Sequence, residues 1–155
     1  MNISTADKVR IGLHSMPRPD VDIVAYQAVT NTVAWVECKS YLDSTGVQMS
    51  AFDGSNPKFA KRFRVFTDPT FREVVTDALV RQMVEERLAR PKPKAEYWLV
   101  AGKIAGSSQD AVAAHFEANG WTLRDRGWVT AALQEVAGDG YEDDVVTMAA
   151  KLLRP

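Results

Sequence analysis

Short β-branched and aromatic segments alternate along the chain with longer segments whose apolar residues recur at helical spacing. Polar and apolar side chains alternate over residues 8–14, which predicts a half-buried strand. Residues 22–26 and 33–39 are strand-like and are separated by a polar segment containing Thr30-Asn31-Thr32, a pattern that predicts an antiparallel hairpin. With the turn centred near residues 29 and 30, paired positions sum to about 59, which sets Asp22 opposite Glu37.

Helical spacing is clearest after residue 68. Asp68 is placed to cap a helix and Pro69 to occupy its first position, where a missing N–H costs nothing, and the apolar spacing continues to about Leu88. The other expected elements are strands over 97–101 and 121–126, helices over 107–116, 129–137 and 142–153, and a loop over 42–58. A hairpin followed by alternating helices and strands predicts an α/β fold with a mixed sheet.

Composition narrows the class of protein. The 155 residues suit a single domain over 1–155, and 19 Lys and Arg against 20 Asp and Glu give a formal charge of −1. This balance excludes a global basic field, so a polyanion would have to bind a local patch. The single Cys38 excludes an intrachain disulfide and multi-cysteine metal sites, which indicates a reducing cytoplasm. The sequence has no apolar run of membrane-spanning length and no signal-peptide pattern near its first residue, so we expect no membrane partner.

The second hairpin strand carries the candidate chemistry. Glu37 and Lys39 share a face with Trp35, because side chains alternate along a strand. Carboxylates facing each other across a hairpin repel unless a cation or proton lies between them. Mg²⁺ prefers one or two carboxylates with water and phosphate oxygens, so Asp22, Glu37 and the backbone carbonyl of Cys38 are candidate ligands. Lys39 is placed to orient a water molecule or to neutralise charge on a phosphate.

These residues carry a resemblance to a known family. Pro19-Asp20-Val21-Asp22, followed by Ile-Val-Ala-Tyr and then by Trp35-Val-Glu37-Cys-Lys39-Ser, resembles the motif of the PD-(D/E)xK nuclease superfamily. The resemblance implies a restriction-endonuclease-like mixed sheet flanked by helices and cleavage of phosphodiester bonds with Mg²⁺ or Mn²⁺. It also implies that Asp22, Glu37 and Lys39 are catalytic. Asp22 matches the family's strand position, whereas Asp20 spells the motif more literally and is a candidate accessory residue.

The N-terminus departs from the family's pattern. Members usually begin with a helix that packs on the sheet and often supplies a further Glu. Here the residues before Asp22 are few and predict a strand, so we expect a reduced N-terminus. The missing helix and carboxylate would then come from the late helices, another subunit or a fused protein.

A basic segment is the candidate nucleic-acid contact. Its cations are interleaved with Phe59, Phe63 and Phe66, a composition that holds phosphates while an aromatic ring stacks on a base. An ordinary loop or short helix with its phenylalanines in the core explains the pattern equally well. The candidate contacts are Lys58, Lys61, Arg62 and Arg64. Gln82 is a further accessory candidate, since some family members place a Gln near the site.

Three functions remain open at this stage. The first is a Mg²⁺-dependent endonuclease acting on nucleic acid, with DNA favoured. The second is a catalytically inactive subunit of the same fold that binds nucleic acid or a protein in a larger complex. The third is a small α/β interaction domain in which Glu37 and Lys39 are coincidental. Because a reduced N-terminus leaves apolar surface uncovered, we also expect a homodimer or a larger complex.

Overall fold

A computed structural model describes residues 3–13 and 19–138. Its strands are β1 (Ile23–Gln27), β2 (Thr32–Lys39), β3 (Lys94–Ala101) and β4 (Thr122–Arg124). Its helices are α1 (Thr5–Arg10), α2 (Pro57–Ala60), α3 (Arg64–Thr67), α4 (Pro69–Glu85), α5 (Gln109–Ala118) and α6 (Arg126–Gly138), with short 3₁₀ turns η1 (Met49–Ala51), η2 (Lys61–Phe63) and η3 (Gly106–Ser108). Among the described residues, no helix combines the length and apolar character that a membrane span requires.

The four strands form one sheet in the order β1-β2-β3-β4. β1 and β2 are antiparallel, whereas β2, β3 and β4 run parallel. The predicted α/β class with a mixed sheet is therefore confirmed. The hairpin register is confirmed as well, because Ile23 pairs with Val36 and Gln27 with Thr32, so that paired numbers sum to 59.

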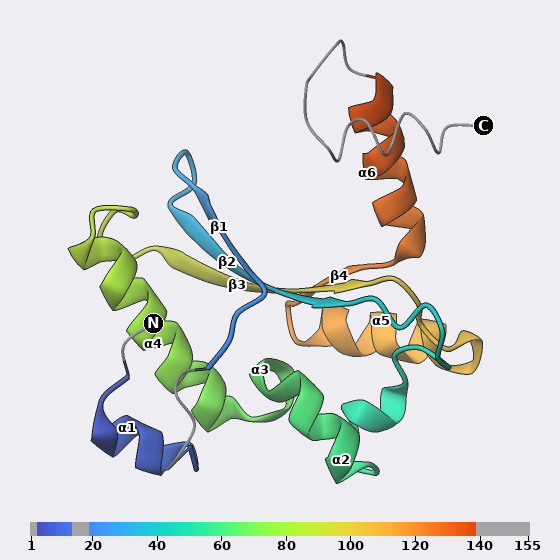
Figure 1. The fold of residues 1–155 in the computed structure, drawn as a ribbon, viewed down its shortest axis with the longest axis horizontal. Helices are drawn as coiled ribbons and strands as arrows, with labels where there is room; N and C mark the ends of the chain where they lie inside the picture. The colour runs from blue at the N-terminus through green and yellow to red at the C-terminus, as the bar shows by residue number, and fades with distance from the viewer. Residues whose placement is uncertain (1–2, 14–18, 139–155) are drawn as a thin grey trace.

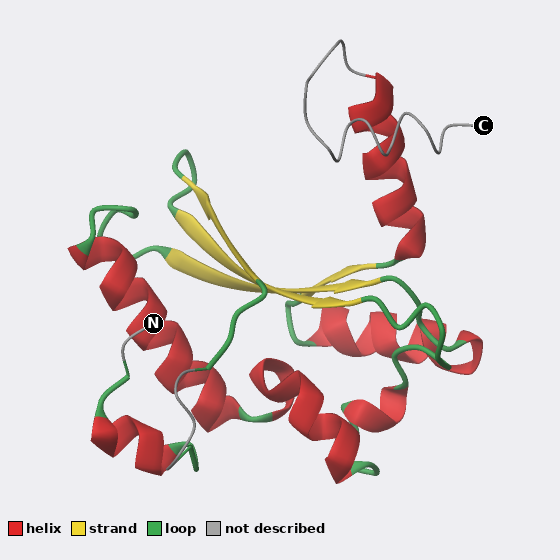
Figure 2. Cartoon of the chain, viewed as in Figure 1, coloured by secondary structure: helices red, strands yellow, loops and turns green. Residues whose placement is uncertain are grey.

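Helices α2 to α5 cover one face of the sheet (Figures 1 and 2). The core on this side is built from alternate strand residues, Trp35, Leu99 and Ala101, against apolar residues of the helices such as Val75 and Phe116. Both helical residues are essentially inaccessible, at 0% and 1% exposed. β2 is thus held between two strands as far as Val36 and lies over a helical layer, which gives the residues that follow a rigid base.

The opposite face of the sheet is less covered. It carries Ala34, Val36 and Trp98, and within the described residues α6 is the helix that lies on this side (Figure 2). The Arg124 guanidinium joins α6 to the sheet, lying 5.1 Å from the Trp98 ring centre and 5.0 Å from that of Trp128. The expectation of a homodimer or a larger complex stays a prediction.

The N-terminal strand expected over 8–14 is wrong, because residues 5–10 form α1. Ser4 caps this helix by accepting a hydrogen bond from the Asp7 backbone N–H, and Ile11 after it enters the core. The local capping signal overrides the short alternation of polar and apolar residues. The N-terminus is therefore a short helix instead of a strand.

The loop expected over 42–58 is only partly right. η1 lies within it, and Val47 makes a parallel bridge with Ile104. The helix after Asp68 ends at Glu85, three residues before the expected Leu88, where Arg87 turns the chain with a φ of 60°. The expected helix over 142–153 lies outside the described residues.

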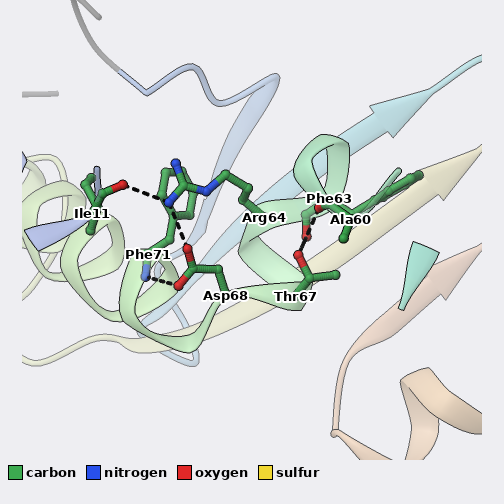
Figure 3. Close-up of polar contacts among 7 residues, drawn as sticks. All are labelled: Ile11, Ala60, Phe63, Arg64, Thr67, Asp68 and Phe71. Atoms are coloured by element: carbon green, nitrogen blue, oxygen red, sulfur yellow. Dashed lines mark hydrogen bonds and ion pairs between the residues drawn. The ribbon is translucent and has the colours of Figure 1, made fainter. Parts of the chain in front are cut away.

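Arg64 ties three helices together (Figure 3). Its Nη2 donates to the Ile11 carbonyl at 2.9 Å and to the Asp68 carboxylate at 2.8 Å, and its guanidinium lies 4.2 Å from the Phe71 ring centre. Asp68 also accepts from the Phe71 backbone N–H at 2.9 Å, as the predicted N-cap of α4. This network fixes the start of α4 against α1 and α3.

We predict that Asp68→Ala destabilises the fold by about 1–3 kcal/mol, because it removes a helix cap and the partner of Arg64. The measurement is the free energy of unfolding in urea. Asp77→Ala, on the exposed side of the same helix, is the matched control and should change stability by less than about 0.5 kcal/mol. Equal effects of the two substitutions would contradict the capping role.

Candidate functional site

The last residues of β2 place a charged pair at the edge of the apolar core. Trp35 is 3% exposed and belongs to the core, and Glu37 and Lys39 follow it on the same face. Their partners on β3 are Leu99 and Ala101, which are fully buried. The side chains of Glu37 and Lys39 retain 16% and 19% exposure, so both charges are largely withdrawn from water.

Asp22 is the residue immediately before β1. β1 pairs with β2 only from Ile23, opposite Val36, so the backbone of Cys38 has no strand partner on that side. The Asp22 Oδ2 fills this place by accepting a hydrogen bond from the Cys38 N–H at 2.7 Å. Since the N–H and C=O of one strand residue point to the same side, the Cys38 carbonyl is directed toward the side of Asp22.

Lys39 connects the two carboxylates. Its ammonium forms an ion pair with Glu37 Oε1, and its Nζ lies 3.9 Å from Asp22 Oδ2. The structure therefore brings Asp22, Glu37 and Lys39 together at one end of the hairpin. The positive charge of Lys39, which both carboxylates share, offsets their mutual repulsion.

Burial raises the pKa values of two residues at this site, Glu37 and Cys38. For Glu37, burial is the largest cause of the raised pKa. The neighbouring Asp22 charge also raises this pKa, while Lys39 lowers it. Burial likewise raises the pKa of the Cys38 thiol, with the Asp22 and Glu37 charges adding to it. The thiol therefore stays protonated at neutral pH, which fits an inert cysteine and not a nucleophile.

The donor set suits a hard divalent cation. In the part of the chain that the structure describes, no group of three or more His, Cys, Asp or Glu side chains is placed to hold a metal. The site instead offers the oxygens of Asp22 and Glu37 and the carbonyl of Cys38. Mg²⁺ is bound in proteins by one or two carboxylates, with water and substrate phosphates completing its shell, so this set fits Mg²⁺ better than a structural zinc.

The other predicted residues are not all brought to this place. Lys58, Lys61 and Arg62 are exposed, but Arg64 is engaged by Asp68, Ile11 and Phe71 and serves the fold. The Gln82 side chain donates to Glu86, and the adjacent Met83 packs with Val33 near the start of β2. Gln82 thus lies along the part of α4 remote from Glu37 and Lys39. Asp20 is exposed and precedes the strand.

Two aromatic residues lie beside the site, and the sequence did not predict them as its neighbours. The Phe63 ring centre lies 5.9 Å from Lys39 Nζ, and Tyr41 contacts the same ring with a centroid separation of 6.5 Å. Tyr41 follows Lys39 by two residues, so its proximity was readable from the sequence. The approach of Phe63 depends on the path of η2 and carries no local signal.

Comparisons of the chain with protein families, curated proteins and solved structures find no match.

We predict that Glu37→Gln, measured without divalent cations, raises the free energy of unfolding at neutral pH. The raised pKa of Glu37 means that folding disfavours its ionised form. Above that pKa the wild type carries the full penalty, whereas below the ordinary glutamate value, about 4.3, the carboxyl is protonated in both states and the penalty vanishes. Urea unfolding between about pH 3.5 and about pH 8 in a chelator should show the variant's advantage shrinking as the pH falls.

Glu96→Gln is the matched control with the opposite sign. Glu96 pairs with Lys94 at 2.9 Å, as Glu37 pairs with Lys39, but the hydrogen bond from Lys94 lowers the pKa of Glu96. Its ionised form therefore stabilises the fold above the ordinary value, and this contribution is lost as the pH falls through the lowered pKa. A Glu37→Gln variant that loses stability as the control does would contradict the account of Glu37.

Proposed function

We propose that the chain is a Mg²⁺-dependent nuclease of the PD-(D/E)xK type with a restriction-endonuclease-like fold, acting on DNA. The observation that carries the proposal is the convergence of Asp22, Glu37 and Lys39 at one end of β2. Glu37 and Lys39 are mostly buried there, although charges of this kind are rarely buried without a partner or a task.

The three side chains have distinct roles in the proposed reaction. Asp22 and Glu37, with the Cys38 carbonyl, would hold Mg²⁺, which when bound lowers the pKa of water and polarises a phosphate oxygen. The Lys39 ammonium stabilises negative charge on the phosphate and orients the attacking water by donating hydrogen bonds. The hydrogen bond from the Cys38 N–H orients the Asp22 carboxylate. Arg62, which is exposed and precedes Phe63, the ring beside Lys39, would hold the nucleic-acid backbone.

A second candidate is an inactive nuclease-fold subunit that binds nucleic acid or a protein partner. The short α1 favours it, because the Asp7 carboxylate accepts a hydrogen bond from Ser4 Oγ, within its own helix turn. The described N-terminal helix therefore supplies no further carboxylate to the site. The presence of all three motif side chains in contact favours the active form.

We predict that the wild type cleaves DNA in Mg²⁺, and that Glu37→Gln and Lys39→Ala each lower the rate by about a hundredfold or more. Added Mg²⁺ should raise the melting temperature of the wild type and of Lys39→Ala but not of Glu37→Gln, since Glu37 is a proposed ligand and Lys39 is not. A cleavage assay on single-stranded, duplex and branched DNA, beside thermal melting with and without Mg²⁺, measures both effects.

The matched controls are Glu96→Gln and Lys94→Ala, which break a similar carboxylate–lysine pair on the neighbouring strand. Both should retain cleavage and the Mg²⁺-induced rise. If Mg²⁺ raises the melting temperature of every variant equally, Glu37 binds no metal. A Mg²⁺ response without cleavage of any substrate would favour the inactive subunit.

A further inference from the structure

A pocket lies beside the proposed nuclease site. Its cavity volume is about 90 Å³, and six of its lining residues are Tyr41, Thr45, Gln48, Phe59, Arg62 and Phe63. None of the acidic residues of the metal set lines it, so it is a separate cavity.

The pocket shares a wall with Lys39. Phe63 lines it, and the same ring lies 5.9 Å from Lys39 Nζ. Tyr41, which contacts the Phe63 ring, leaves β2 two residues after Lys39 with a φ of 46°. At this left-handed residue the chain leaves β2, and Tyr41 itself lines the pocket. A ligand in the pocket is therefore a near neighbour of a phosphate held at Lys39.

Close backbone packing makes the pocket wall rigid. Gly102 donates to the Lys39 carbonyl at 2.8 Å, and a Cβ at Gly102 would lie 2.5 Å from the Ser40 carbonyl oxygen. Gly46 has a φ of 92°, and its Cβ would lie 2.8 Å from the Lys103 carbonyl oxygen. Only glycine fits at these two approaches. The loop after β2 is consequently pinned to the loop after β3, and the pocket is formed before any ligand binds.

The lining matches the chemistry of a nucleobase. Tyr41 and Phe59 supply aromatic rings for a flat π-system beside the buried Phe63, while Thr45 and Gln48, whose side chains are hydrogen-bonded to each other, keep further donors and acceptors for its polar edge. Arg62 lies with its guanidinium 5.6 Å from the Phe59 ring centre and adds a cation at the rim. Because a paired base is stacked inside a duplex, only an unpaired base can enter.

We infer that this pocket binds an unpaired nucleobase next to the phosphate held at Lys39, so that the preferred substrate is single-stranded DNA or DNA with an unpaired nucleotide. This inference rests on the proposed function, which places the scissile phosphate at Lys39.

The test is binding of a short fluorescently labelled single-stranded DNA and of its duplex, measured by anisotropy in a chelator. The wild type should bind the single strand at least about fivefold more tightly, the lower end of what stacking one base contributes. Thr45→Trp fills the pocket from an exposed position and should weaken single-strand binding by about fivefold or more, with duplex binding unchanged. Ser44→Trp, at another exposed lining position, is the second filling variant.

Thr70→Trp adds the same bulk at an exposed position of α4 outside the pocket, and should bind as the wild type does. Melting temperatures confirm that each variant is folded. Equal affinity of the wild type for both DNA forms, or unchanged single-strand binding in folded Thr45→Trp and Ser44→Trp, would overturn the inference. Failure of the nuclease proposal is recognised by a different result: the wild type cleaves none of the substrates in Mg²⁺.

Discussion

The site depends on where β1 stops. β2 is hydrogen-bonded on both sides as far as Val36, but β1 reaches only Ile23, so the last residues of β2 continue with a neighbour on one side alone. The unpaired backbone of Cys38 must then find another partner, and the Asp22 carboxylate provides it at 2.7 Å. That single hydrogen bond holds a second carboxylate beside Glu37. Lys39 offsets one of the two negative charges, and the negative charge that remains favours a further cation at this place.

The surrounding fold divides its basic residues between structure and surface. Arg64 belongs to the network that fixes α1, α3 and the start of α4, while Lys58, Lys61 and Arg62 remain exposed. The phenylalanines between them divide in the same way, since Phe63 is buried under Lys39 and Phe59 remains half-buried at the pocket. A segment in which basic residues and phenylalanines are interleaved thus contributes to the core on one side and a cationic rim on the other.

The hairpin and the capped helix could be predicted because their signals are local. β-branched residues around a polar turn fix the register, and Asp68 with Pro69 fixes the start of α4. The predictions that were wrong have non-local or competing causes. The polar and apolar alternation over residues 8–14 predicts a strand, but the cap at Ser4 stabilises a helix there. The structural role of Arg64 depends on Ile11, which is distant in sequence. The pocket was beyond prediction for the same reason, because it forms only where the loop after β2 meets residues of α2 and η2, namely Phe59, Arg62 and Phe63.

The central claim is that Asp22 and Glu37 form one cation site, and isothermal titration with Mn²⁺ tests it most directly. Asp22→Asn can still accept the hydrogen bond from the Cys38 N–H but removes the charge, whereas Asp20→Asn removes a nearby exposed charge that precedes β1. The account predicts one Mn²⁺ site per chain in the wild type and in Asp20→Asn, and at least about tenfold weaker binding in Asp22→Asn. Unchanged Mn²⁺ affinity in Asp22→Asn, or its loss in Asp20→Asn alone, would contradict it.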